Sequence, residues 1–464
     1  MNRFLLRKTV SRRMEFSPPT TETLCQEFGI IVITTTCMQT SIVIIIIGLF
    51  IFWGHYLSAV FERRGIPDVL GLMVIGILLG PVFHIVDPAS FGKFGPLFSN
   101  LVLIFILFES GTDLKISEVQ KSFKESAGIT VIGFLVTSVI LATLCYYIFH
   151  LPVLACMFIG TALGGTSSAV VVGLVKKIKV KPKTSTILIM ESVETDVFTL
   201  AFPISILGLM ITGEFAIQTV VSQFMASLII ALMIGIGGAF LWSFILNRLP
   251  GLKNTKFSTP AFLFILYGIT EYLNFSGPLT ALSFGIAIGN LKYFEPKLLE
   301  RIISNKEIVL PEDERSFFSE LVFLLRIFFF VFIGISIHIQ RMDWLMWGAV
   351  MTLALCLARI FYVPLVIPKS TPLLDKAVIS CMIPKGLGAA VIATLPFQKG
   401  VANGDMIQAI CFSLILFSTV FTVFFFFLIN KGWSLGFYRL IYGRDKVQEF
   451  TLKEKLSQPM AGNQ

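Results

Sequence analysis

The sequence predicts an all-α polytopic membrane protein with about thirteen transmembrane helices, arranged as two inverted six-helix repeats. Its composition, a series of long apolar segments and an internal repeat lead to this fold class. Of the 464 residues, 55% are hydrophobic and only 14% are charged. A chain this apolar cannot bury its hydrophobic surface inside soluble domains alone, so we expect it to lie in a lipid bilayer.

A helix that crosses a bilayer needs about 20 predominantly apolar residues. Thirteen segments of the sequence are candidates, with ends that are uncertain by several residues: 39–61, 67–85, 96–112, 122–149, 152–175, 184–212, 216–246, 257–274, 278–291, 316–337, 344–368, 372–397 and 404–430. We therefore expect a transmembrane domain over residues 39–430, an N-terminal extension over residues 1–38 and a cytoplasmic tail over residues 431–464.

The net charge of +9 is distributed over the loops between these segments. Most Lys and Arg residues lie on one set of alternating loops and in the C-terminal tail, whereas the opposite loops hold only Lys93, Arg341 and Lys399. Because cytoplasmic loops collect basic residues, this places the C-terminus inside the cell and the start of the first span outside. The basic residues form no single patch, so we expect no nucleic-acid partner.

The N-terminal extension conflicts with this topology, because five of its basic side chains would lie outside: Arg3, Arg7, Lys8, Arg12 and Arg13. One hypothesis is that translation begins at Met38. The other is that residues 1–38 form a short amphipathic or disordered leader. Sequencing the N-terminus of the natural protein distinguishes the two.

The sequence shows no motif of an enzyme or of a resident cofactor. Its seven cysteines occur singly and mostly inside apolar segments, which indicates neither a zinc site nor a disulfide framework. Its four histidines have no metal-ligand spacing, and HExxH, GxSxG and phosphate-binding loops are absent. We expect no cofactor and no catalytic activity.

Three blocks of sequence recur in the same order in the two halves of the chain. The matches are VIGILLG, ending at Gly80, with FGIAIG, ending at Gly289; the segment from Phe98 with that from Phe318; and GGTSSAVVVGL, from Gly164, with KGLGAAVIATL, from Lys385. Paired blocks are an odd number of spans apart, so the second copy runs through the membrane in the opposite direction. Inverted repeats of this kind form carriers with a binding site near the midplane.

Glycine or proline interrupts two predicted spans near their middle, in GGTSS of the fifth span (152–175) and PKGLG of the twelfth (372–397). Non-helical backbone is tolerated at membrane depth only where it faces protein or a cavity. Because the two breaks occupy matching positions of an inverted repeat, we expect them to form a binding site. Free carbonyl and N–H groups there can replace the water around an ion.

The sixth span (184–212) carries Glu191, Glu194, Thr195 and Asp196 inside an apolar segment. A charged side chain at the membrane centre costs roughly 2.5 to 3.5 kcal/mol on insertion scales, so it normally faces protein or a water path. Removal from water favours the protonated carboxyl, whereas a bound cation favours the carboxylate. One carboxyl group can therefore exchange H⁺ for a cation, and we predict this role for Asp196. The alternative is that these acids pair with Lys or Arg for structure alone.

Three basic residues of the predicted spans also receive roles. Lys385 lies inside the break of the twelfth span, and we predict that it pairs with Glu191 or approaches Asp196, holding the two broken spans near the sixth. Arg326 and Arg359 are predicted to be structural, because a guanidinium is permanently charged and suits fixed pairing or snorkelling.

These segments resemble the monovalent cation/proton antiporter superfamily, specifically the sodium/proton antiporters with thirteen spans. The resemblance covers about Gln39 to Asn430 and rests on motifs in the family's order: GIPDVLGLMVIGILLGP, LFESGTDLKI, GTSSAVVVGLV, ESVETD, LLRIFFFVFIGISI and the broken segment around Lys385. It implies exchange of Na⁺ or Li⁺ for H⁺ across the inner (plasma) membrane. It also implies a homodimer, in which a six-helix core moves like an elevator against a dimerisation domain.

The resemblance carries over to individual residues. Asp196 matches the ion-binding aspartate, and Thr166 and Ser167 match the polar stretch of the crossing. Thr195 stands where electrogenic members have Asp and electroneutral members Asn, so we include it in the predicted ion site. Glu191 resembles the electroneutral branch and Lys385 the electrogenic one. With a single exchangeable carboxylate, one H⁺ trades for one Na⁺, and we predict electroneutral exchange unless Lys385 loses a proton when Na⁺ binds.

The nearest alternative is a K⁺/H⁺ antiporter or ungated potassium efflux carrier. Ligand-gated members usually append a nucleotide-binding domain, and residues 431–464 contain no GxGxxG. A cation channel is a different class, because it needs a continuous pore. An intramembrane enzyme built on Ser167, Ser168 and Asp196 would lack a histidine or second catalytic aspartate. The sequence leaves Na⁺ or K⁺ selectivity and the activating pH open.

Overall fold

The computed structural model describes residues 45, 48–49, 51–61, 67–86, 94–114, 116–175, 180–213, 217–249, 257–273, 275–291, 312–337, 341–368 and 370–443. The chain divides into two compact units, Met1–Trp53 and Gly54–Gln464. Few residues of the first unit are described, and the predicted extension over residues 1–38 lies outside them. The labelled elements below all belong to the second unit.

The described part of the second unit is helical, as predicted. Its elements are α2 (Asp68–Ile77), η1 (Leu78–Val82), α3 (Phe94–Asp113), α4 (Ile116–Phe149), α5 (Val153–Ala162), α6 (Ser168–Val175), α7 (Pro182–Thr212), α8 (Ile217–Arg248), α9 (Ser258–Tyr272), α10 (Gly277–Gly289), α12 (Glu312–Ile335), α13 (Met342–Val366), α14 (Leu373–Cys381), α15 (Leu387–Gln398), α16 (Gly404–Asn430) and α17 (Leu435–Tyr442). From 67–85 onward, each predicted span coincides with one helix or a consecutive pair, with ends that differ by a few residues. α17 was not predicted.

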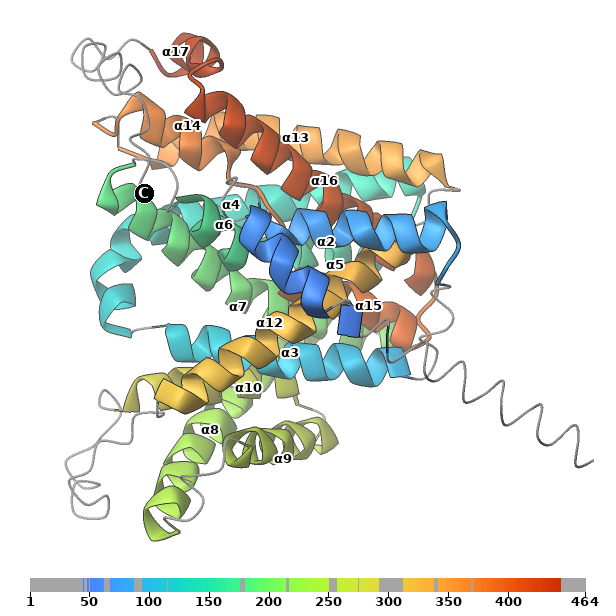
Figure 1. Cartoon of the computed structure of the whole chain (residues 1–464), viewed down its shortest axis with the longest axis vertical. Helices are drawn as coiled ribbons and strands as arrows, with labels where there is room; N and C mark the ends of the chain where they lie inside the picture. The colour runs from blue at the N-terminus through green and yellow to red at the C-terminus, as the bar shows by residue number, and fades with distance from the viewer. Residues whose placement is uncertain are drawn as a thin grey trace, which may run out of the picture. The chain divides into compact units, whose positions relative to one another are not determined.

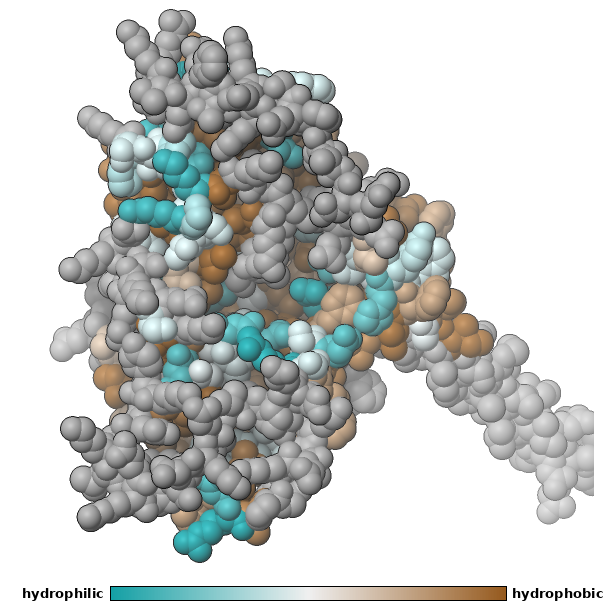
Figure 2. All heavy atoms as spheres, turned by 60° about the vertical axis from the view of Figure 1, so that its left-hand side comes forward, coloured by the Kyte–Doolittle hydropathy of each residue, from teal (hydrophilic) through white to brown (hydrophobic). Residues whose placement is uncertain are grey.

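Six helices of the described chain are long and apolar enough to cross a membrane, within α4, α7, α8, α12, α13 and α16. Shorter apolar helices of the described chain include α5 and α15, which are one half of each interrupted span. The predicted number of thirteen spans therefore stays a prediction. Figure 2 shows hydrophobic side chains, in brown, at the surface of the face it presents, as expected for a protein whose surroundings are lipid.

The helices pack in two groups. In Figure 1, α8 and α9 of one group lie at one end of the second unit, and α13, α14 and α17 of the other group lie at the opposite end. One group consists of α4, α5, α6, α7, α13, α14, α15, α16 and α17, and the other of α2, α3, α8, α9, α10 and α12. Fewer contacts join the groups, mainly those of α15 with α3 and of α7 with α8. Both interrupted spans and the acidic α7 belong to the first group, which we call the site bundle.

The inverted repeat appears in the packing of the second group. Gly76 and Gly285 occupy matching positions of one repeated block, and Gly111 and Gly334 belong to matching copies of another. A Cβ atom on Gly76 would lie 2.8 Å from the Cα atom of Gly334, and one on Gly285 would lie 3.2 Å from that of Gly111. α2 thus crosses α12 as α10 crosses α3, which is the relation expected between two copies of one unit.

Candidate functional site

Both predicted breaks are present, and their backbones meet. α5 ends at Ala162 and α6 begins at Ser168, while α14 ends at Cys381 and α15 begins at Leu387. Between the two gaps, the N–H of Ser167 donates a hydrogen bond of 2.7 Å to the carbonyl of Pro384. The two interrupted spans therefore cross at their non-helical segments, where short half-helices end inside the bundle.

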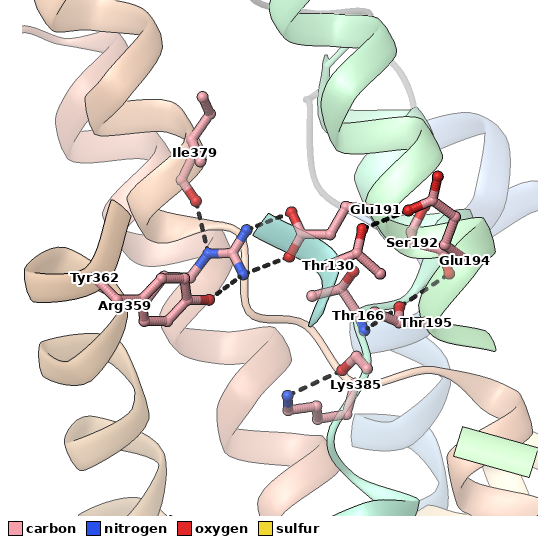
Figure 3. Close-up of polar contacts among 11 residues, drawn as sticks. Thr130, Thr166, Glu191, Ser192, Glu194, Thr195, Arg359, Tyr362, Ile379 and Lys385 are labelled. Atoms are coloured by element: carbon pink, nitrogen blue, oxygen red, sulfur yellow. Dashed lines mark hydrogen bonds and ion pairs between the residues drawn. The ribbon is translucent and has the colours of Figure 1, made fainter. Parts of the chain in front are cut away.

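Lys385 lies at this crossing and is 3% exposed. Its Nζ donates a hydrogen bond of 2.9 Å to the carbonyl of Gly165 (Figure 3). The lysine of one break therefore provides a hydrogen-bond partner for a backbone carbonyl of the other. Its backbone N–H donates to the Oγ of Ser418 on α16 at 3.1 Å. Lys385 thus links the two broken segments through a backbone carbonyl, and its predicted approach to Asp196 stays a prediction.

The predicted pairing of Lys385 with Glu191 is wrong, because the Glu191 carboxylate forms its ion pair with Arg359 of α13. Nη1 and Nη2 of Arg359 donate to Oε1 and Oε2 of Glu191 at 2.6 and 2.7 Å. A guanidinium presents two parallel N–H groups to both carboxylate oxygens, which a lysine ammonium cannot do. This geometry explains why Glu191 pairs with arginine and not with lysine. Arg359 is 4% exposed and Glu191 2%, so the pair is fully buried.

The remaining donors of Arg359 fix its orientation. Its Nε donates to the carbonyl of Ile379 at 2.8 Å, and Nη1 donates to the Oη of Tyr362 at 2.8 Å. Ile379 lies in the last turn of α14, just before the break. The Glu191–Arg359 pair therefore ties α7 to the end of the half-helix that leads into the crossing (Figure 3).

Thr195 joins α7 to the other break. Its Oγ1 accepts a hydrogen bond of 3.2 Å from the N–H of Thr166 and donates one of 3.1 Å to the carbonyl of Ser192. Thr195 and Thr166 are both buried, and Ser167 lies beside them at the crossing. The Thr195 hydroxyl therefore holds the crossing against α7, and its part in the ion site stays a prediction.

Asp196 follows Thr195 on α7 and points to a different side of the helix, where it is half-buried. Its backbone carbonyl accepts a hydrogen bond from the Oγ1 of Thr199. Glu194, also half-buried, faces α4, where its carboxylate accepts hydrogen bonds of 2.7 and 2.6 Å from the hydroxyls of Ser126 and Thr130. The α7 acids thus have three different surroundings within two helical turns.

α7 and the crossing carry oxygen atoms of three kinds: the carboxylate of Asp196, the hydroxyls of Thr166, Ser167 and Thr195, and the backbone carbonyls of the two non-helical segments. Carboxylates, hydroxyls and carbonyls are the ligands that hard monovalent cations accept. Among the described residues no cluster of His, Cys, Asp and Glu has the geometry of a resident metal site.

Arg326 lies away from this site, in the second helix group. Its Nη2 is 3.4 Å from the Oδ2 of Asp68 on α2, and its guanidinium lies 5.3 Å from the ring centre of Phe323.

Sequence reasoning did not identify Tyr362, the Ile379 carbonyl or Ser418 as parts of the site. The spacing of Arg359 and Tyr362, three residues apart on one helix, is the one signal that pointed to such a contact.

Comparison with known proteins agrees with this geometry. Residues 33–431 match the sodium/hydrogen exchanger transmembrane family. A K⁺/H⁺ antiporter, NhaP, of Alkalimonas amylolytica is 23% identical over 406 residues, which span 85% of this chain and 66% of that relative. The "Probable Na(+)/H(+) antiporter 2" of Methanocaldococcus jannaschii is 20% identical over 407 residues, 82% of this chain and 93% of that relative.

The fold is also that of a solved structure, the sodium proton antiporter MjNhaP1 from Methanocaldococcus jannaschii, with a TM-score of 0.67 at 20% identity. The match covers 87% of this chain and the whole of that one. Because the family match extends over most of the sequence and includes the crossing, α7 and α13, the chain belongs to the sodium/hydrogen exchanger family of membrane-embedded transporters.

Proposed function

We propose that the chain is a secondary active transporter that exchanges Na⁺ or Li⁺ for H⁺ by alternating access, with Asp196 as the exchange site. The observation that carries this proposal is the crossing of two broken helices beside α7. A hydrogen bond from Lys385 to Gly165 joins the two breaks, and one from Thr166 to Thr195 joins the crossing to α7. The crossing places non-helical backbone against α7, which also carries the half-buried Asp196, and broken helices of this kind form the ion sites of carriers. Family membership supports the same activity.

Competition for one carboxylate couples the two ions. A cation bound at Asp196 stabilises its negative charge, whereas a proton removes that charge, so each ion expels the other. We propose that Thr195, Thr166 and Ser167 complete the ligand shell. Lys385 and the Glu191–Arg359 pair are fixed charges around this site, and we assign them supporting roles. Arg326, outside the site bundle, has a structural role.

A K⁺/H⁺ exchanger is the second candidate, because the relative from Alkalimonas amylolytica carries that description. The chain spans about two thirds or less of the K⁺/H⁺ antiporters it matches, 66% of one and 41% of another. Reconstitution into liposomes with Na⁺, Li⁺ and K⁺ offered in turn, with a pH-sensitive dye inside, ranks the cations directly.

The central test is Asp196→Asn, with Asp343→Asn as a matched control. Asp343 is an exposed carboxylate in the first turn of α13, far along the chain from the crossing. Asp196→Asn keeps the shape of the side chain but removes the titratable oxygen, so cation-dependent proton movement should be lost while the variant elutes and melts like the wild type. Near-normal exchange by Asp196→Asn would refute the assignment, and Asp343→Asn should exchange normally.

Stoichiometry follows from the number of exchangeable charges. One carboxylate trades one H⁺ for one monovalent cation, so we propose electroneutral exchange. Reversal potentials in liposomes test this, because a membrane voltage applied without any ion gradient should drive no transport. Voltage-driven transport would show that a second group, for which Lys385 is the candidate, gives up a proton during the cycle.

The finer cellular picture is also a proposal. We place the transporter in the inner (plasma) membrane with a cytoplasmic C-terminus, because basic residues collect on one set of loops. The two helix groups suit an elevator in which the site bundle moves against α2, α3, α8, α9, α10 and α12. We propose that this second group also forms a homodimer, which native mass spectrometry of the purified protein tests.

A further inference from the structure

The short helix α17 has apolar side chains on two opposite faces. Its inner face buries Leu435 and Tyr438, which pack toward α14. Its outer face, together with the turn before it, leaves three large side chains exposed: Trp433 at 74%, Phe437 at 52% and Leu440 at 86%. A surface helix normally needs only one apolar face, so the outer face of α17 requires a partner.

The outer face continues the lipid-facing side of the last predicted span. Phe424 and Phe427 of α16 are both about half exposed, and the ring of Phe427 lies 6.4 Å from that of Trp433. α16 ends at Asn430, so Trp433 stands where a spanning helix leaves the hydrocarbon. Tryptophan favours this interfacial level, because its ring is amphipathic.

The charge around α17 complements an anionic surface. Lys431 is exposed, with its Nζ 5.7 Å from the ring centre of Phe427, and Arg439 lies in the last turn of the helix. In the sequence Arg444 and Lys446 follow directly. Basic residues next to an apolar helix face are typical of helices that lie in the plane of a membrane and bind anionic headgroups.

The inner face fastens α17 beside the buried ion pair. The Oη of Tyr442 donates to the carbonyl of Ile360 at 3.0 Å and shares a 2.5 Å hydrogen bond with the Oγ of Ser380. Ile360 is the residue after Arg359, and Ser380 is the residue after Ile379, whose carbonyl holds Arg359. Tyr442 therefore bonds to α13 and to α14, in each case at the residue next to one that positions the Arg359 guanidinium.

We propose that α17 is a membrane-surface contact of the site bundle, which binds anionic lipid through Trp433, Phe437, Leu440 and Lys431 and transmits that contact through Tyr442 to the Arg359 region. The lipid contact is independent of the proposed exchange, whereas its effect on rate rests on that function. Tyr442 is a positioning residue in this scheme, because it acts through Arg359 and touches no ion.

Fluorescence quenching tests the lipid contact without any transport measurement. The full-length protein and Trp433→Phe are reconstituted in brominated phosphatidylcholine, with and without added phosphatidylglycerol. The difference between the two proteins isolates Trp433, whose emission should be largely lost, and more so with phosphatidylglycerol. Trp433 emission that no brominated vesicle quenches would overturn the proposal. So would a Trp433 emission that changes only when cytosolic protein is added, since that result identifies a soluble partner.

Two matched variants test the charge. Lys431→Gln should abolish the extra quenching due to phosphatidylglycerol. Arg341→Gln should leave it intact, because Arg341 is likewise exposed over an aromatic ring, 4.3 Å from the centre of Trp344, but lies at the N-terminus of α13. An equal effect of both variants would show a general response to charge and would contradict a specific contact at α17.

Tyr442→Phe tests the transmission. This variant should retain Trp433 quenching but lose most of the dependence of exchange rate on phosphatidylglycerol. An unchanged rate dependence would reject the role of Tyr442. If no exchange occurs in the wild type under any lipid, the proposed function fails, and the quenching result still decides whether α17 binds the membrane.

Discussion

The Glu191–Arg359 ion pair is buried, so removing either partner alone has a large free-energy cost. Both groups are removed from water, so their mutual attraction and the hydrogen bonds from Arg359 to Ile379 and Tyr362 replace the lost hydration. Such a pair contributes little net stability compared with apolar residues of the same shape. Breaking it is costly, because one buried charge is then left alone.

Removing one partner should therefore unfold the site bundle more readily than removing both. We expect Arg359→Ala to lower the stability by about 3–5 kcal/mol. The double variant Glu191→Leu with Arg359→Met should recover much of this loss, because no charge stays buried. Thermal unfolding in detergent measures both. A double variant as unstable as the single one would indicate that the carboxylate and guanidinium act separately.

Thr195 permits a conservative test of the crossing. Thr195→Val keeps the shape of the side chain but leaves the N–H of Thr166 without its acceptor, at a cost of about 1–3 kcal/mol. Thr195→Ser keeps the hydroxyl. We expect the valine variant to exchange cations poorly and melt early, whereas the serine variant stays close to wild type in both dye-based exchange and melting. Equal activity of the two variants would assign Thr195 no role through its hydroxyl.

Lys385 separates support from coupling. Lys385→Ala removes the bond to the Gly165 carbonyl, so a lysine that only holds the crossing should cost thermal stability first. A lysine that takes part in the ion cycle should instead change the reversal potential or the pH profile of exchange. Measuring melting and reversal potential on the same variant distinguishes these roles, with Lys385→Arg as the charge-preserving control.

At the scale of elements, close helix crossings repeat around the second helix group. Gly80 approaches Ile335 as Gly289 approaches Thr112, where added Cβ atoms would lie 2.9 and 3.0 Å from the facing Cα atoms. The sequence repeat pairs these glycines with each other. Small residues at such crossings let helix backbones approach closely in a membrane, where packing replaces the hydrophobic effect as the driving force.

Alanine at repeat-related positions should therefore be equally harmful. Gly76→Ala and Gly285→Ala each place a methyl group against the backbone of the facing helix, and we expect each to destabilise by about 1–3 kcal/mol. Gly237→Ala is the control, since its Cβ would meet no atom within 4 Å. That variant should be neutral or gain up to about 1 kcal/mol of helix stability. If all three melt alike, the close crossings do not limit stability.

Periodicity and breaker residues were sufficient to predict most helices. Glycines at 164–165 and Pro384 indicated where the fifth and twelfth spans break, and both breaks are present. α17 escaped prediction because its eight residues are far shorter than a span, and the segment after Asn430 was expected only to form a cytoplasmic tail. The partner of Glu191 also escaped prediction, because side-chain reach across three helices depends on packing that no local pattern encodes.

At the scale of the molecule, the fold follows from one unit used twice in opposite directions. The two copies bring their breaks together at one crossing, where the N–H of Ser167 bonds the carbonyl of Pro384. We propose that a relative motion of the two helix groups opens a pathway to Asp196 on either side of the membrane. The charge of the loops is not repeated in the same way, and we propose that the basic loops determine which way the molecule faces.

Single cysteines at described loop ends test this orientation. Arg341→Cys and Lys399→Cys should react with a membrane-impermeant maleimide in intact cells, whereas Arg248→Cys and Lys431→Cys should react only after the membrane is permeabilised. All four positions are exposed, and the five cysteines of the described chain are buried. Cys25 and Cys37 lie outside the described residues, so each variant also carries Cys25→Ser and Cys37→Ser, and the protein with only these two changes measures the background. Labelling of Lys431→Cys in intact cells would reverse the topology, and α17 would then face the outer leaflet.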